Sequence, residues 1–137
     1  MSETRLSGGC ACGAVRYDCA AAPVIVAHCH CRDCQRASGA AMSTVFAVPR
    51  AALHSRGQTR SYATRGDSGN PVLRHFCGEC GSPLYSEVTV LPDLQFVRAA
   101  SLDNPASVSP TMHIYCDSAQ PWGRPLDDLP HFAKMPG

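Results

Sequence analysis

The segment Cys77-Gly78-Glu79-Cys80-Gly81 constrains the fold of this 137-residue chain more than any other stretch. Two cysteines separated by two residues on a tight turn place both sulfur atoms on one side, at the separation that a tetrahedral metal ion needs. A glycine follows each cysteine, and glycine permits the positive φ angles of such a turn. Zinc sites recurrently use this spacing, with Zn–S bonds of about 2.3 Å. The segment therefore predicts one half of a zinc site.

Five further cysteines fall into two groups of similar spacing, Cys10-Ala11-Cys12-Gly13 and Cys29-His30-Cys31-Arg32-Asp33-Cys34. Two pairs together supply four thiolates and close a tetrahedral site, whereas a group of three leaves one coordination position open. Closed zinc sites are structural, and three protein ligands with an open position are typical of catalytic zinc. We therefore expect two zinc ions per chain. The structural ion would bind Cys10, Cys12, Cys77 and Cys80, and the catalytic ion would bind Cys29, Cys31 and Cys34.

The spacing leaves other arrangements open. His28 or His30 could supply a fourth ligand and make the three-cysteine site structural as well. Disulfides among these seven cysteines are disfavoured because the sequence shows no signal peptide, and thiols inside the cell stay reduced; with nine cysteines, complete pairing is also impossible. An iron–sulfur cluster is disfavoured because the three groups match no common cluster spacing. The two remaining cysteines, Cys19 and Cys116, each end a strand-like run, and we expect them in the core, where free cysteine usually lies.

Composition narrows the class of protein. Hydrophobic residues at 45% and charged residues at 17% exclude a disordered chain. The net charge of +1 makes nucleic acid an unlikely partner, and no stretch approaches the ~20 apolar residues of a membrane span. The first residues, MSETRLSGGC, contain no apolar run of signal-peptide length. We expect one domain over residues 1–137, in a cytoplasmic protein with reduced thiols.

The pattern of short apolar runs predicts a mainly β fold. Eight runs have strand character, at 14–18, 24–27, 43–48, 60–64, 72–76, 84–90, 95–100 and 112–116. Only two short helical turns are expected, at 32–38 before Gly39 and at 49–53. Many short strands separated by turn residues favour antiparallel sheets in a sandwich or half-barrel with little helix.

The last part of the sequence, residues 121–137, has four prolines and no periodicity. It also carries large apolar residues, among them Trp122, Leu126 and Phe132. We therefore expect an irregular C-terminal strap that packs on the body of the domain.

Three segments form a recognisable pattern: Gly8-Gly9-Cys10-Ala11-Cys12-Gly13-Ala14-Val15-Arg16-Tyr17, the run from Cys29 to Gly39, and the run from Arg74 to Leu84. The later His113-Ile114-Tyr115, Pro121-Trp122 and Leu129-Pro130-His131-Phe132 continue it. This pattern resembles the glutathione-dependent formaldehyde-activating enzyme family, which includes centromere protein V. The resemblance covers a core of about residues 6–120 and continues into the strap.

This resemblance implies an Mss4-like fold of antiparallel sheets with two zinc ions, the four-cysteine site being structural and the three-cysteine site reactive. It also implies the family activity, which joins glutathione and formaldehyde to give S-hydroxymethylglutathione and is classed as a carbon–sulfur lyase. The expected partners are thus a glutathione-like thiol and an aldehyde.

An open tris-thiolate zinc suits that chemistry, because coordination deprotonates a thiol and a thiolate adds to an aldehyde carbonyl. His30 is the first candidate for general acid or base, with His28, His75 and His113 as further candidates. Substrate carboxylates could meet arginines at Arg32, Arg36 or Arg74. The alternative function is a non-catalytic, zinc-stabilised module that binds a protein or a nucleic acid.

Overall fold

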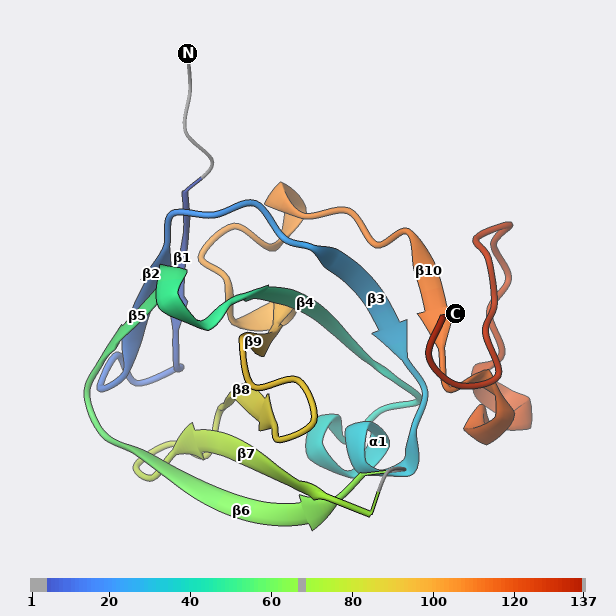
Figure 1. Cartoon of the computed structure of the whole chain (residues 1–137), viewed down its shortest axis with the longest axis horizontal. Coiled ribbons are helices and arrows are strands. Elements are labelled where there is room, and N and C mark those ends of the chain that lie inside the picture. Colours follow the sequence, from blue (N-terminus) through green and yellow to red (C-terminus); the bar gives the residue numbers. More distant parts are fainter. Residues whose placement is uncertain (1–4, 67–68, 137) are drawn as a thin grey trace.

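Ten strands form two sheets in the computed structural model, which describes residues 5–66 and 69–136 (Figure 1). The larger sheet has seven strands in the order β10-β3-β4-β9-β8-β7-β6. Their bounds are Met112–Ile114 (β10), Ile25–Cys29 (β3), Ser43–Pro49 (β4), Leu94–Arg98 (β9), Pro83–Val88 (β8), Pro71–Cys77 (β7) and Thr59–Arg65 (β6). The smaller sheet, in the order β1-β2-β5, contains Leu6–Gly9 (β1), Arg16–Cys19 (β2) and Leu53–Arg56 (β5). The result is the mainly β fold that the sequence predicts.

The chain passes from the small sheet to the large one between β5 and β6, which Figure 1 shows as one long ribbon. Gly57 makes this crossing with a φ angle of 90°. A Cβ atom at Gly57 would lie 2.1 Å from the carbonyl oxygen of Ala14, in the turn before β2. Only glycine fits there, because both the backbone angle and the close approach exclude a side chain.

The main hydrophobic core lies between the two sheets. Its largest fully buried apolar side chains are Phe46 and Val48 from β4, Leu84 from β8, Val97 from β9, and Val15, which directly precedes β2. A second, smaller cluster joins Ala27 and Cys29 of β3 to Cys34 and Ile114. This second cluster places two cysteines of the predicted reactive group against the sheet.

The predicted elements correspond closely to those observed. Each of the eight predicted runs overlaps a strand, and the helix α1 spans Arg32–Ser38 as expected. Gly39 ends α1 in the left-handed conformation at φ 68°, and its N–H donates to the carbonyl of Gln35. The turn expected at 49–53 is a 3-10 helix at Arg50–Ala52. The strands at Leu6–Gly9 and Leu53–Arg56 were not predicted.

One strand pairing differs from the expected antiparallel pattern. β10 pairs with β3 in parallel, while the other neighbours in both sheets are antiparallel. The chain reaches β10 through the long irregular connection after β9, so it can approach β3 from either direction. β10 then ends early because Tyr115 takes a left-handed φ of 56°, which no regular strand accommodates.

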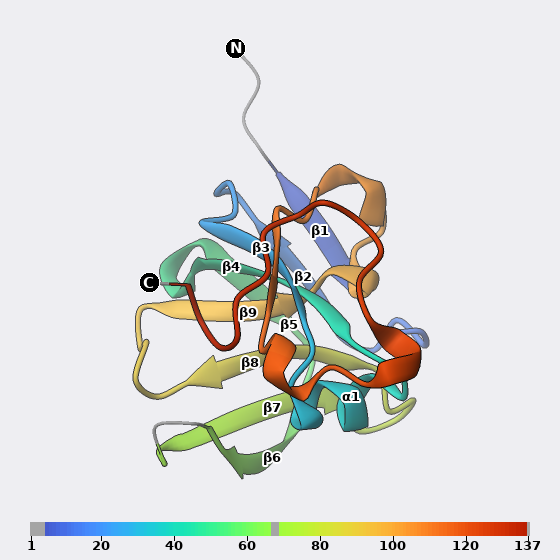
Figure 2. The ribbon, with the colours of Figure 1, turned by 90° about the vertical axis from the view of Figure 1, so that its right-hand side faces the viewer.

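The C-terminal strap (residues 121–136 of the described chain) lies beside β10 (Figure 2). The N–H of Phe132 donates to the carbonyl of His113 at 2.9 Å, and the N–H of His113 donates to Pro130 at 2.8 Å. The Phe132 side chain packs on the second core cluster. Trp122 and Leu126 do not pack as expected, since they are 74% and 100% exposed. Their short segment is attached by prolines and turns, and it does not reach the core.

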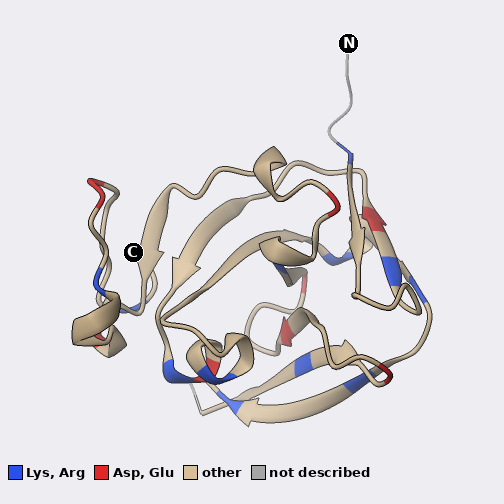
Figure 3. Ribbon diagram, turned by 180° about the vertical axis from the view of Figure 1, so that it is seen from behind, with Lys and Arg blue, Asp and Glu red and all other residues tan. Residues whose placement is uncertain are grey.

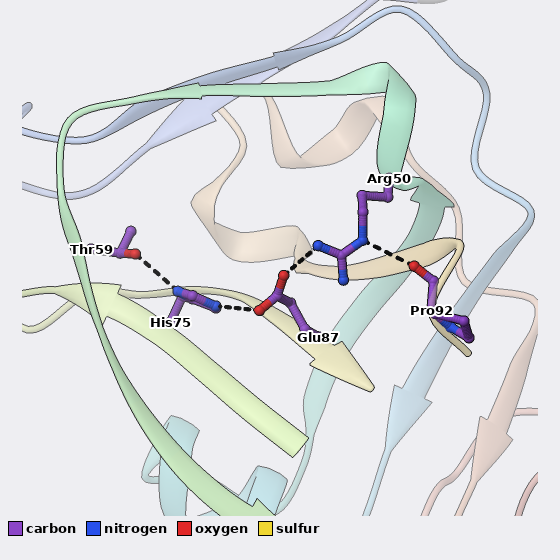
Figure 4. Close-up of polar contacts among 5 residues, drawn as sticks. All are labelled: Arg50, Thr59, His75, Glu87 and Pro92. Atoms are coloured by element: carbon purple, nitrogen blue, oxygen red, sulfur yellow. Dashed lines mark hydrogen bonds and ion pairs between the residues drawn. The ribbon is translucent and has the colours of Figure 1, made fainter. Parts of the chain in front are cut away.

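A polar network joins β6, β7, β8 and the turn after β4 (Figure 4). Thr59 Oγ1 lies 2.9 Å from His75 Nδ1, and His75 Nε2 lies 3.0 Å from a Glu87 oxygen. Arg50 pairs with Glu87 and donates to the Pro92 carbonyl at 2.9 Å. Burial alone would raise the pKa of Glu87, but the hydrogen bonds from His75 and Arg50 lower that pKa below its usual value. His75 therefore serves this network.

Across residues 5–66 and 69–136, no helix has the length and apolar character needed to cross a membrane.

We predict that Cys19→Ala lowers the free energy of unfolding by about 1 kcal/mol, as is typical of a core substitution. Cys19 is fully buried in the main core and takes no part in either cysteine group. Urea denaturation measures the loss, and metal analysis should find unchanged content. Cys116→Ala, at a half-buried position, should cost less. Loss of a bound metal ion from either variant would contradict this assignment.

Candidate functional site

Four cysteines from two distant turns meet at one end of the sheets. Cys10 and Cys12 lie in the turn between β1 and β2, whereas Cys77 ends β7 and Cys80 lies in the turn that follows it. The four sulfur atoms all lie within 4.8 Å of one another. Gly81, whose φ is 78°, supplies the left-handed residue of the second turn.

The sulfur separations in this group suit a tetrahedral ion. The Sγ atoms of Cys10 and Cys12 are 3.6 Å apart, and those of Cys12 and Cys77 are 3.7 Å apart. Zn–S bonds of 2.3 Å in a tetrahedron would put sulfurs roughly 3.8 Å apart. The N–H of Val15 donates to Cys10 Sγ at 3.2 Å and lowers the pKa of that thiol. A hydrogen bond with Ser82 lowers the pKa of Cys80 to about 5. The backbone hydrogen bond of Ala14 lowers the pKa of Cys12, but a hydrogen bond with Cys10 and desolvation of the Cys12 thiol outweigh this and raise that pKa to about 12. The sulfur separations, rather than the pKa shifts, are therefore what suit this group to a metal ion.

The second group lies where β3 leads into α1. Cys29 ends β3, Cys31 precedes the helix and Cys34 lies in its first turn. The Sγ of Cys31 accepts a hydrogen bond from the Cys34 N–H at 3.3 Å and so caps the helix. The three sulfur atoms again lie within 4.8 Å of one another. This geometry also permits a bound metal ion.

A buried arginine faces this second group. Arg98, at the end of β9, is only 6% exposed. Its Nη1 donates to Ser43 Oγ at 2.6 Å and lies 3.7 Å from Cys34 Sγ. Hydrogen bonds from Cys29 and Cys31, with the positive charge of Arg98, lower the pKa of Cys34 to about 2. A thiolate at Cys34 thus has a fixed countercharge inside the protein. The hydrogen bonds within the group raise the pKa of Cys29, and the pKa of Cys31 is also raised, so Cys34 is the thiol that ionises first when no metal ion is bound.

Among the described residues, no His, Asp or Glu lies close enough to the three sulfurs to be a fourth ligand. His30 lies between Cys29 and Cys31 in the sequence, but its fully buried ring turns to His113, with His30 Nε2 2.9 Å from His113 Nδ1. His28 is bonded instead to Thr44, at 2.8 Å from its Nδ1. Alternate residues of an extended segment point to opposite faces, which separates these histidines from the cysteines. Neither ring is therefore placed to act as a fourth ligand of the three-cysteine group.

All three cysteines open onto a pocket of about 460 Å³. Its apolar wall includes Val45, Val72, Phe96 and Ile114. Its charged lining comprises five basic residues against two acidic ones, namely Arg32, Arg65, Arg74, Arg98 and Lys134 against Asp33 and Asp117. Figure 3 shows Lys and Arg positions in blue on α1 and on the nearby strands β6 and β7. The pocket therefore suits an anionic ligand of modest size.

Some of the residues predicted to contact the substrate line this pocket and others do not. Arg32 and Arg74 line the pocket, whereas Arg36 does not. None of the candidate histidines at positions 28, 30, 75 and 113 belongs to the lining.

Three basic lining residues, Arg65, Arg98 and Lys134, were not predicted. An arginine inside the apolar run Phe96-Val97-Arg98-Ala99-Ala100 was the available signal for Arg98, because a charge in a buried strand needs a partner.

Comparisons with known proteins give the family of this chain. The family model "Glutathione-dependent formaldehyde-activating enzyme" matches residues 5–118. The chain belongs to this family. A Halomonas elongata relative is 27% identical over 123 residues, which cover 85% of this chain and 78% of the relative. Its own name assigns it only provisionally as a glutathione-dependent formaldehyde-activating enzyme.

The fold of this chain is also similar to that of a solved structure. A crystal structure of a Rhodobacter sphaeroides protein from structural genomics superposes with a TM-score of 0.58 at 19% identity. The superposition covers 91% of this chain and 98% of the other. At that identity the similarity concerns the fold alone.

We predict that Arg98→Met raises the pH at which the thiols of the metal-free three-cysteine group ionise by about one unit or more, because a nearby cation lowers an acidic group's pKa by roughly 1–3 units. Arg98→Lys, which keeps the charge, should shift the titration less. Thiolate absorbance against pH measures the effect, and Cys34→Ser in each background isolates the contribution of Cys34. Identical titrations of Arg98→Met and the unmodified protein would contradict this role.

Proposed function

We propose that this chain is a zinc-dependent carbon–sulfur lyase-type enzyme that acts on a thiol–aldehyde adduct, like S-hydroxymethylglutathione synthase. The observation that carries the proposal is the three-thiolate group of Cys29, Cys31 and Cys34, which opens onto a pocket with an excess of basic residues and has no fourth protein ligand among the described residues. A closed structural site would need no such pocket. Membership of the family supports the thiol as glutathione and the aldehyde as formaldehyde.

Zinc is the proposed metal at both cysteine groups. Thiolates are soft ligands, and sets of three or four of them select zinc over calcium or magnesium. The ion at Cys10, Cys12, Cys77 and Cys80 is closed and structural in this proposal. The ion at Cys29, Cys31 and Cys34 keeps one position open, where it would hold an incoming thiol as its thiolate.

Residues of the pocket supply a countercharge for the thiolates and a group that can bind a carboxylate of the substrate. The Arg98 guanidinium offsets the negative charge of the thiolate group from inside the protein. Arg74, half-buried on β7 and bonded to Thr64 Oγ1 at 3.3 Å, is positioned to bind a carboxylate of the thiol substrate. The apolar wall limits water around the reacting carbonyl. In the synthetic direction a C–S bond forms, the C=O double bond becomes a single bond, and the thiol proton ends on the new hydroxyl oxygen.

The general acid or base for that proton remains a prediction. His30 was the first candidate from the sequence, but its ring is bonded to His113 and lies outside the pocket lining. Its position does not favour direct proton transfer to a substrate in this pocket. Solvent that enters the open pocket is the alternative carrier.

We predict opposite outcomes for Cys80→Ser and Cys34→Ser. The first removes a ligand from a site that joins turns 65 residues apart, and structural zinc carries an apparent ~10–16 kcal/mol, comparable with the ~5–15 kcal/mol stability of a whole domain. Cys80→Ser should therefore be unfolded or insoluble. Cys34→Ser loses a local site and should keep a native circular dichroism spectrum, with one zinc ion instead of two and no adduct formation from glutathione and formaldehyde.

Metal analysis under reducing conditions and an adduct assay measure both variants. If Cys34→Ser unfolds as fully as Cys80→Ser, the second ion is structural. The alternative function, a zinc-stabilised binding module without catalysis, would then be the better account.

We predict that Arg74→Met raises the KM for glutathione about tenfold or more, since a hydrogen bond between charged groups contributes about 1.5–3 kcal/mol. The same variant should react normally with 2-mercaptoethanol, a thiol without carboxylates. Arg36→Met is the matched control, because Arg36 is an exposed arginine of the same helix that carries Cys34 and lies outside the pocket. Equal effects of Arg74→Met on both thiols would rule out carboxylate binding by Arg74.

A further inference from the structure

Three histidines lie side by side on adjacent extended segments, on the face of β3 opposite to Cys29. His113 of β10 is directly opposite His28 of β3 in the parallel register. His131 of the C-terminal strap forms an isolated parallel bridge with His113. The ring centroids are 4.7 Å apart for His28 and His113, and 5.0 Å apart for His113 and His131. Strand pairing, rather than chance contact of surface side chains, fixes this row.

A carboxylate from the strap completes the arrangement. Both oxygens of Asp127 lie 3.0 Å from Nε2 of His113. One ligand atom each from His28, His113 and Asp127 lie within 4.8 Å of one another. These three residues form a cluster that does not include His131, and none of them lines the pocket of the three-cysteine group. The cluster is therefore separate from the site assigned to the thiol and the aldehyde.

Each member of this cluster has a second partner that orients it. Nδ1 of His28 is bonded to the Thr44 hydroxyl at 2.8 Å, which leaves its Nε2 for another ligand. Nδ1 of His113 is bonded to His30 at 2.9 Å, while its Nε2 faces Asp127. The N–H of Leu129 donates to Asp127 Oδ1 at 3.1 Å. Metal-binding histidines characteristically use one ring nitrogen for the ion and the other for such a supporting hydrogen bond.

We propose that His28, His113 and Asp127 form a third metal site, which takes a divalent first-row transition ion through nitrogen and oxygen ligands. Two imidazoles and one carboxylate are a recurrent ligand set for such ions and leave further coordination positions for water or another ligand. The two cysteine groups bind through sulfur alone, so the third site differs from them in ligand chemistry as well as in position. The inference does not depend on the proposed reaction.

An ion at this site would join the strap to the large sheet. Asp127 belongs to the strap, whereas His28 and His113 belong to β3 and β10. Lys134 and Met135, which follow in the same strap, line the pocket of the three-cysteine group. Binding of the ion should therefore also restrain one wall of that pocket.

The test adds Co²⁺ to the full-length protein after zinc has been loaded to two ions per chain. We expect equilibrium dialysis to show one further cobalt ion per chain. Its visible spectrum should contain the weak bands of nitrogen and oxygen ligation, without the intense ultraviolet charge transfer that thiolate ligands give. Asp127→Asn should weaken this binding at least about tenfold, since losing even an outer partner of a ligand costs 10–100-fold.

Asp128→Asn is the matched control, because it removes the same charge from the next, exposed residue of the strap. It should bind cobalt like the unmodified protein. His28→Gln is the second ligand variant, and it should lose cobalt as Asp127→Asn does, with both folds checked by circular dichroism. The proposal fails if zinc-loaded protein takes up no cobalt, if cobalt binds only with sulfur charge transfer, or if Asp127→Asn and Asp128→Asn bind it equally. In that case the cluster is a hydrogen-bonded support for the strap.

Discussion

The convergence of Cys10, Cys12, Cys77 and Cys80 is the constraint on which the other parts of the structure depend. It joins a turn of the small sheet to a turn of the large sheet, with Cys12 and Cys77 sulfurs 3.7 Å apart across 65 residues of sequence. Closing so long a loop costs conformational entropy, which a shared metal ion can offset. β7 and β8 start or end at this junction, and β9 pairs with β8 in turn. The position of Arg98, at the end of β9, follows from that sequence of pairings.

Much of this arrangement is predictable from local patterns. The cysteine spacings, together with a count of four ligands for a closed site, predict the two clusters that the fold brings together. The helix at Arg32–Ser38 follows from a glycine that can take a left-handed φ at its end. The strand Leu6–Gly9 was missed because its sequence, Leu-Ser-Gly-Gly, has weak β propensity; pairing with β2 forms it. The exposure of Trp122 was also missed, since large apolar residues usually pack. The direction in which the His30 ring points was not predictable either, because it depends on His113 of β10, to which the ring is bonded.

Charge balance around the three cysteines shows how a thiolate can be accommodated inside the protein. A buried anion is costly unless a countercharge accompanies it, and Arg98 provides that charge at 6% exposure. Ser43 accepts one of its hydrogen bonds and so holds the guanidinium at a fixed place. Arg98 lines the same pocket as the other basic residues, of which Arg32, Arg65 and Lys134 are exposed to solvent. The pocket thus combines one buried cation beside Cys34 with basic residues that water can reach.

The order of strands in the large sheet has a consequence for association between molecules. A sheet of seven strands has two edges, and unpaired edges can recruit strands from other chains. Here β10, at one edge, is bordered by residues 130–132 of the strap, which occupy its hydrogen-bonding groups. β6, at the other edge, carries Arg60 and Arg65 on a largely exposed surface. Charged side chains discourage edge-to-edge pairing. One edge is thus covered and the other is charged, which protects the folded protein against polymerisation through its sheet.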